Sequence, residues 1–158
     1  MKSLLIIVWS CLLLGNASPL VPHTQTPPSV YFLHNSALPR TDSAWYQQQE
    51  DLNSLEDVVD TVIHMLKENP QMVISTIGYC DYLEDDRSTL ALARAQKVRD
   101  MLIDKGVPPD QVEAQERGEQ FRITAEQVAT IKDPKEIEAA HAVNRYVNYI
   151  ALRFDRKQ

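Results

Sequence analysis

A stretch near the middle of the chain, residues 77–81 with the sequence IGYCD, most strongly constrains how this protein can fold. It is typical of a β-strand that ends on a carboxylate, Asp81. A short loop with three acidic residues at 84–86 follows, and then an amphipathic helix that carries Arg94 in its early turns. Because this layout leaves Asp81 and Arg94 at the same end of a sheet, a ligand that bears both an ammonium and a carboxylate could bridge them.

The apolar and turn patterns on either side predict further strands and helices. In chain order we expect a strand at 30–32, a helix with its apolar face from Leu52 to Leu66, a strand at 72–79, a helix from about Ser88 to Gly106, a strand at 112–115, one or two helical segments over 124–143 that break at 133–134, and a strand at 147–154. The start of the first helix is open, since Asp42 could cap a long helix or Ser54 a shorter one. The order β-α-β-α-β-(α)-β predicts an α/β sandwich with helices packed on a mixed sheet.

The size and charge of the chain indicate one acidic domain. It has 158 residues and a formal net charge of −6, and this length is enough for a single domain to bury a core. Lysine and arginine form no continuous stripe in the sequence. We therefore expect no nucleic acid or anionic membrane surface as a partner.

The first residues predict export from the cytoplasm. Met1-Lys2 is positively charged, residues 4–14 are apolar, and the small residues at 15–17 fit a signal-peptidase site. We expect a signal peptide at 1–17 and a mature chain that begins at Ser18. The apolar run is too short to span a membrane, which takes about 20 residues.

A lipid anchor is disfavoured, because Cys11 follows the residues Val8-Trp9-Ser10 and not the Leu-Ala-Gly-like triplet of a lipoprotein signal. After cleavage only Cys80 remains, so no internal disulfide is expected. Residues 18–29 are rich in proline and predict an extended leader, followed by one domain over 30–158.

Several motifs along the chain, in matching order, resemble those of OmpA-like domains, the peptidoglycan-binding module of Gram-negative envelopes. The central match is GYCD with LALARA, which is similar to the family's "GHTD … LSxxRA". The other matches are VYFLHNS at 30–36 for "VYFDFNS", LKENP at 66–70 for "LKxNP", KGV at 105–107, the Gly118-Glu119 end of "GxGE", and NRYV at 144–147 for "NRRV". Together they cover roughly residues 30 to 154.

The resemblance implies a specific ligand and a specific site. In OmpA-like domains the residues that match Asp81 and Arg94 hold the diaminopimelate of the peptidoglycan stem peptide, the aspartate through the ammonium and the arginine through the carboxylate. The other residues expected at this ligand site are Asn144, Arg145, His141, Cys80 and Arg87. The implied function is non-catalytic binding that localises the protein at the cell wall, in the periplasm and near the outer membrane.

The chain also departs from the family pattern. Leu33 replaces an aspartate of the opening strand, Cys80 a threonine, Arg87 an asparagine, Glu116 the first glycine of "GxGE" and Tyr146 the second arginine of "NRRV", and the loop before the helix is about two residues shorter. The charged pair is kept while part of its hydrogen-bonding rim has changed. This favours weaker or altered affinity, and it leaves open an OmpA-like scaffold with a degenerate site that binds an envelope protein.

Spacing alone favours a structural role for the charged pair, in which Asp81 caps the following loop and Arg94 pairs with one of the acidic residues at 84–86.

An enzyme is the weakest hypothesis. His34, His64, His141 and Cys80 lack the spacing of a zinc site, and no Ser-His-Asp order or phosphate loop is visible. We therefore expect no catalysis, cofactor or metal, and a buried thiol at Cys80.

Overall fold

The computed structural model describes residues 29–48, 52–118 and 120–154. The expected signal peptide at 1–17, with Cys11, and all of the expected leader at 18–29 except Ser29 lie outside the described residues. The elements in chain order are β1 (Val30–Tyr31), α1 (Ser43–Gln47), α2 (Leu55–Glu68), β2 (Met72–Tyr79), α3 (Arg87–Asp104), the 3₁₀ helix η1 (Pro109–Gln111), β3 (Val112–Gly118), α4 (Ala125–Val128), α5 (Pro134–Ala142) and β4 (Tyr146–Phe154).

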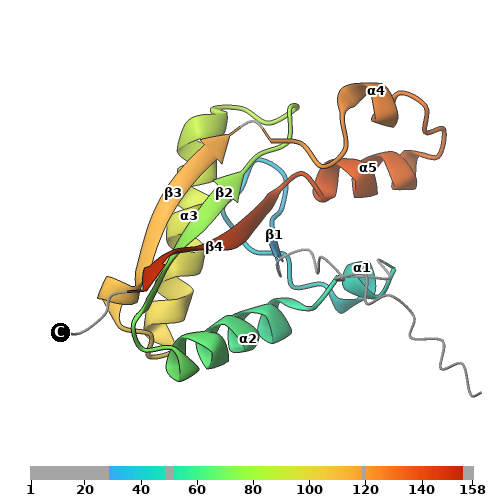
Figure 1. Cartoon of the computed structure of the whole chain (residues 1–158). Coiled ribbons are helices and arrows are strands. Elements are labelled where there is room, and N and C mark those ends of the chain that lie inside the picture. Colours follow the sequence, from blue (N-terminus) through green and yellow to red (C-terminus); the bar gives the residue numbers. More distant parts are fainter. Residues whose placement is uncertain (1–28, 49–51, 119, 155–158) are drawn as a thin grey trace, which may run out of the picture.

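The four strands form one mixed sheet in the order β1-β4-β2-β3. β2 is parallel to β3 and antiparallel to β4, and β1 is antiparallel to β4. In Figure 1, α3 runs behind the strands, whereas α4 and α5 lie beyond the end of the sheet at which β4 begins. The predicted α/β fold with helices on a mixed sheet is confirmed.

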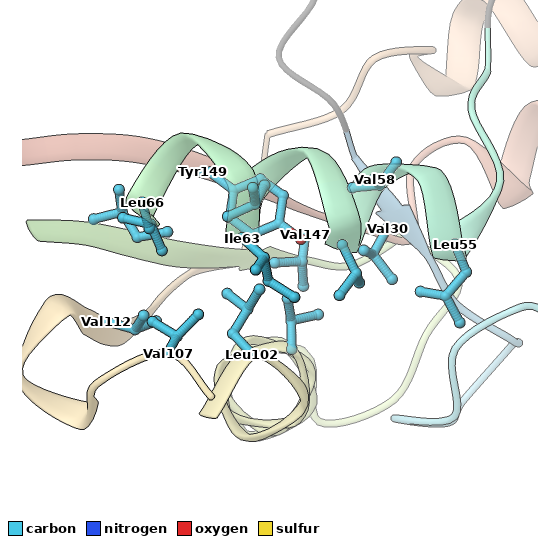
Figure 2. Close-up of a cluster of buried hydrophobic side chains, with 14 of the residues drawn as sticks. Val30, Leu55, Val58, Ile63, Leu66, Leu102, Val107, Val112, Val147 and Tyr149 are labelled. Atoms are coloured by element: carbon cyan, nitrogen blue, oxygen red, sulfur yellow. The ribbon is translucent and has the colours of Figure 1, made fainter. Parts of the chain in front are cut away.

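The main hydrophobic core lies between α2, α3 and the sheet. Figure 2 shows Ile63 of α2 pointing toward Leu102 of α3, with Leu66 and Val58 toward the two ends of α2 and Val147 and Tyr149 of β4 beside them. α2 contributes its buried residues at steps of three and four, which is the pattern of a helix with one apolar face. Burial of these side chains holds both long helices against the strands.

The open question about the first helix is settled by two separate caps. Asp42 accepts a hydrogen bond from the backbone of Trp45 and begins α1, while Ser54 accepts one from Asp57 and begins α2. The prediction that Leu52 lies on the helix face was therefore wrong. Leu52 precedes α2 and packs against a second cluster of buried residues, which is centred on tyrosines.

The ends of the later helices follow the predicted signals. Gly106 lies just after α3 with φ +96°, a left-handed conformation that glycine adopts without strain. Asp133 caps α5 and Pro134 is its first residue, so α4 and α5 are separate at the predicted break. β3 extends to Gly118, beyond the predicted end at residue 115.

A glycine fixes the contact between β2 and α3. A Cβ atom on Gly78 would lie 1.8 Å from the backbone oxygen of Ala91, so no larger residue fits between strand and helix. This close approach brings the early turns of α3 against the end of β2. Arg94, one turn after Ala91, is thereby placed beside the residues that follow the strand.

Candidate functional site

The candidate site lies where β2 ends, and it is formed by the loop 80–86, the first turns of α3 and the segment after α5. Figure 1 shows the end of β2 and the end of α5 at the same end of the sheet. This is the location that the sequence predicted for Asp81 and Arg94. Both residues are fully buried, at 0% exposure.

Asp81 is held by partners from two parts of the chain. Its Oδ1 accepts a hydrogen bond of 3.0 Å from the backbone of Leu83 and lies 3.0 Å from Nδ1 of His141. Its Oδ2 accepts a hydrogen bond of 2.9 Å from the side chain of Asn144. Residues 60 and 63 positions later in the chain therefore orient this carboxylate.

Asn144 also fixes the loop that precedes α4. Its side-chain oxygen accepts from the backbone N–H groups of Arg122 and Ile123 at 2.8 and 3.0 Å, and its nitrogen donates to the Ile123 carbonyl at 2.8 Å. Asn144 is fully buried and uses both ends of its amide. It links Asp81 to the backbone of residues 122–123.

Arg94 forms a bidentate ion pair with Glu84. Its Nη1 donates to Oε2 of Glu84 at 2.7 Å and its Nη2 donates to Oε1 at 2.5 Å. Both side chains are 0% exposed. The guanidinium also donates to the carbonyls of Ser36, Tyr79 and Leu33, at 2.9, 3.1 and 3.0 Å.

The carboxylate of Glu84 is surrounded by hydrogen-bond donors. Besides the guanidinium, it accepts from the backbone N–H groups of Asp81 and Asn35 at 3.0 and 2.8 Å. Burial alone would raise the pKa of Glu84, but the hydrogen bonds and charge of Arg94 and these two backbone donors outweigh it. The pKa of Glu84 is therefore lowered from its usual value, and the group is ionised at neutral pH.

Cys80 is a buried thiol next to the ion pair. Its Sγ lies 3.3 Å from Nη1 of Arg94 and 3.3 Å from the carbonyl oxygen of Arg87. Burial raises the pKa of the thiol to about 12, although the nearby charge of Arg94 acts in the opposite direction. Such a thiol is protonated and unreactive at neutral pH. The side chain of Arg87 donates to the carbonyl of Tyr82 at 3.3 Å.

Arg145 is buried in a different position from its neighbour Asn144. Its Nε donates to the carbonyl of Phe32 at 3.4 Å, and its Nη2 donates to Glu138 of α5 at 2.5 Å. The carboxylate of Asp81 contacts Leu83, His141 and Asn144. The structure thus groups Asp81, His141 and Asn144, groups Arg94 with Cys80, and ties Arg145 to Phe32, which follows β1, and to α5.

Two features of the site were not singled out from the sequence. Glu84 was one of three acidic candidates, and the structure selects it as the partner of Arg94. Tyr82 packs edge-on against both Phe121 and His141, with ring centroids 5.6 and 5.1 Å apart. An aromatic residue directly after Asp81 is the only sequence signal that could have drawn attention to this contact.

Both contacts expected if Asp81 and Arg94 have a structural role are present, since Asp81 accepts a hydrogen bond from the backbone of Leu83 and Arg94 pairs with Glu84.

Within residues 29–48, 52–118 and 120–154, no group of three or more histidine, cysteine, aspartate or glutamate side chains is arranged to hold a metal ion. In the same ranges, no helix has the length and apolar character needed to cross a membrane.

Comparison with known proteins identifies the family and the fold. The family model described as the OmpA family matches residues 45–135. Among curated proteins, none matches the chain. The solved structures of similar fold include the peptidoglycan-associated lipoprotein from Burkholderia pseudomallei, at 23% identity and a TM-score of 0.58 over 84% of this chain and 98% of that chain.

Two further solved structures share the fold at lower identity. The OmpA-like domain of FopA1 from Francisella tularensis is 11% identical, with a TM-score of 0.51 over 82% of this chain and 74% of that chain. A MotB-like protein from Desulfovibrio vulgaris is 16% identical, with a TM-score of 0.51 over 81% of this chain and 70% of that chain. At these identities the likeness concerns the fold.

Proposed function

This chain belongs to the OmpA family, and on that premise we propose that it is a non-catalytic module that binds peptidoglycan and holds the protein at the cell wall. The observation that carries the proposal is the convergence of Asp81, His141 and Asn144 beside Arg94 at the end of β2. Oε2 of Glu84 accepts from both the Asp81 backbone and the Arg94 guanidinium, so Asp81 and Arg94 share one hydrogen-bond partner.

The ligand group we propose is the zwitterionic end of a diaminopimelate residue. Oδ2 of Asp81, oriented by Asn144, would accept from the ligand ammonium, and the planar fork of Arg94 would hold the ligand carboxylate. His141 and Arg87 would flank this group, and Cys80 would pack behind Arg94. Arg145 would support the pocket through its bonds to Phe32 and Glu138.

We propose a location in the periplasm. The similar fold of a protein that is named peptidoglycan-associated supports this location, as does the signal peptide predicted at 1–17. Intact-mass analysis of protein from the periplasm tests the export step. A mass that begins at Ser18 is expected, whereas an uncleaved chain or a lipid on Cys11 would contradict it.

Co-sedimentation with purified sacculi tests the function. Wild type should pellet with sacculi. Asp81→Asn should require roughly ten- to a hundredfold more peptidoglycan to pellet to the same extent, because a charge-assisted hydrogen bond contributes about 1.5–3 kcal/mol. Asp110→Asn is the matched control, since it removes the same charge at an exposed position of η1. If wild type stays in the supernatant, or if Asp81→Asn pellets as wild type does, the proposal is wrong.

A second candidate function is the binding of an envelope protein, and it rests on three exposed leucines. Leu33, Leu38 and Leu83 are 39%, 61% and 58% exposed. They lie on the two loops that Asn35 and Glu84 join by a hydrogen bond. Crosslinking in the periplasm tests this candidate: a protein partner lost in Leu38→Ser and Leu83→Ser, without loss of sacculus binding, would support it.

A further inference from the structure

The position of Glu84 bears on how the site takes up a ligand. Its carboxylate accepts hydrogen bonds from Nη1 and Nη2 of Arg94 and from the backbone of Asp81 and Asn35, at 2.5 to 3.0 Å. One guanidinium and two backbone N–H groups therefore form a complete pocket for one carboxylate. In this structure a side chain of the protein itself occupies that pocket.

Arg94 has no donor left for a second carboxylate. A guanidinium carries five N–H groups, and those of Arg94 point to three backbone carbonyls and to both oxygens of Glu84. The three carbonyls are fixed in the backbone, and the thiol of Cys80, 3.3 Å from Nη1, belongs to a short side chain, so Glu84 is the partner that can rotate away. A ligand carboxylate can reach Arg94 only by taking the place of Glu84, and this exchange keeps the buried charge balanced.

The segment that carries Glu84 is a surface loop between β2 and α3. Asp86 has φ +43°, a left-handed conformation that is strained for a residue with a side chain. Leu83 is 58% exposed, and Asp85 reaches Asn35 of the neighbouring loop through two hydrogen bonds of 3.0 and 3.1 Å. A groove of about 310 Å³ lies along this loop, lined by Asn35, Asp85, Asp86, Thr89, Leu90 and Ala93.

We propose that Glu84 is a built-in competitor for the ligand carboxylate, so that the site is closed until the loop at 82–86 moves and releases Arg94. The inference rests on the proposed function, because it concerns the same ligand. Only the small fraction of wild-type molecules in which Glu84 has left the pocket can bind the ligand. The measured affinity of wild type is therefore lower than that of the open site in proportion to this fraction. Specificity follows as well, since only a ligand with a carboxylate benefits when Glu84 is removed.

Titration of Glu84→Ala with two stem peptides tests the proposal. The first peptide contains diaminopimelate, and the second has lysine in its place and so lacks the side-chain carboxylate. We expect Glu84→Ala to bind the diaminopimelate peptide about tenfold or more tightly than wild type does, with little change for the lysine peptide. Asp85→Ala is the matched control, because it removes the hydrogen bond that the Asn35 side chain donates to Asp85 and leaves Glu84 on Arg94; its gain should be smaller.

Removal of Glu84 leaves its pocket vacant and should lower the stability of the protein, so the second measurement is the melting temperature of Glu84→Ala with and without acetate. Acetate should raise the melting temperature of Glu84→Ala by filling the pocket, and should leave wild type and Asp85→Ala unchanged. If Glu84→Ala is too unstable for titration, Glu84→Gln is titrated in its place, since its amide has a similar shape and no charge.

The outcomes separate this inference from the proposed function. If Glu84→Ala and Glu84→Gln bind the diaminopimelate peptide no better than wild type does, and acetate does not stabilise Glu84→Ala, then Glu84 is only a structural ion-pair partner and the inference is wrong. If no variant binds either peptide or sacculi while acetate still stabilises Glu84→Ala selectively, the carboxylate pocket is supported and the peptidoglycan function fails.

Discussion

Glu84 and Arg94 form a bidentate ion pair with both side chains fully buried, at oxygen–nitrogen distances of 2.7 and 2.5 Å. Glu84→Gln and Arg94→Met should each lower the free energy of unfolding by about 3–5 kcal/mol, because each leaves the other charge buried without its partner. The double variant should lose less than the sum of the two, since it leaves neither charge unpaired. Urea denaturation of the four proteins measures this coupling, and strictly additive losses would show that the pair contributes little.

Acid should destabilise the protein through the same pair. The pKa of Glu84 is lower in the folded state than its usual value of 4.5, so the unfolded chain binds the proton first as pH falls. The stabilisation is complete above pH 4.5 and is lost as pH falls through the folded pKa, with a slope of at most about 1.4 kcal/mol per pH unit. Urea denaturation between pH 3 and 7 should give Glu84→Gln a shallower acid slope than wild type, and equal slopes would contradict this.

Gly78 should tolerate no larger residue. Because a Cβ atom there would lie 1.8 Å from the backbone oxygen of Ala91, Gly78→Ala must push α3 off the sheet and should cost about 3 kcal/mol or more. Gly106→Ala is a useful comparison, since that Cβ meets nothing within 4 Å and the loss of about 1–2 kcal/mol comes from its positive φ alone. Thermal unfolding of both variants decides the order, and a smaller loss for Gly78→Ala would refute the packing argument.

Cys80 should be chemically inert while the protein is folded. Its thiol is fully buried and its pKa is raised to about 12, so iodoacetamide at pH 8 should label it only after denaturation. Peptide mass spectrometry assigns the label to Cys80. Cys80→Thr should keep the fold, because threonine is of similar size and its hydroxyl can donate to the carbonyl of Arg87. Rapid labelling of the native protein would instead indicate an accessible, reactive thiol.

The sequence predicted those parts of the fold that depend on neighbouring residues. Ser54 as one of two candidate caps, the helix break at 133–134, the glycine after α3 and the strand at 72–79 all follow from local propensities, and each is present in the structure. Leu52 was misplaced because its spacing fits the helical period, although the helix begins only after Ser54.

The sequence could not supply contacts between distant segments. Glu84, Asp85 and Asp86 are equivalent candidates in the sequence, and the choice among them depends on Asn35, whose backbone binds Glu84 and whose side chain binds Asp85 from 49 and 50 positions away. Arg145 and Asn144 are adjacent in one motif, yet the structure directs Arg145 to Glu138 and Asn144 to Asp81. These assignments depend on how α5 packs against the sheet.

Calorimetric titration of wild type with a diaminopimelate-containing stem peptide tests the central claim most directly, with Asp81→Ala as the comparison and circular dichroism to show that both are folded. The account predicts saturable binding by wild type and an affinity lower by roughly ten- to a hundredfold in Asp81→Ala, because the ligand ammonium loses its carboxylate partner. No binding by wild type, or equal binding by the two proteins, would contradict the claim that this site recognises peptidoglycan.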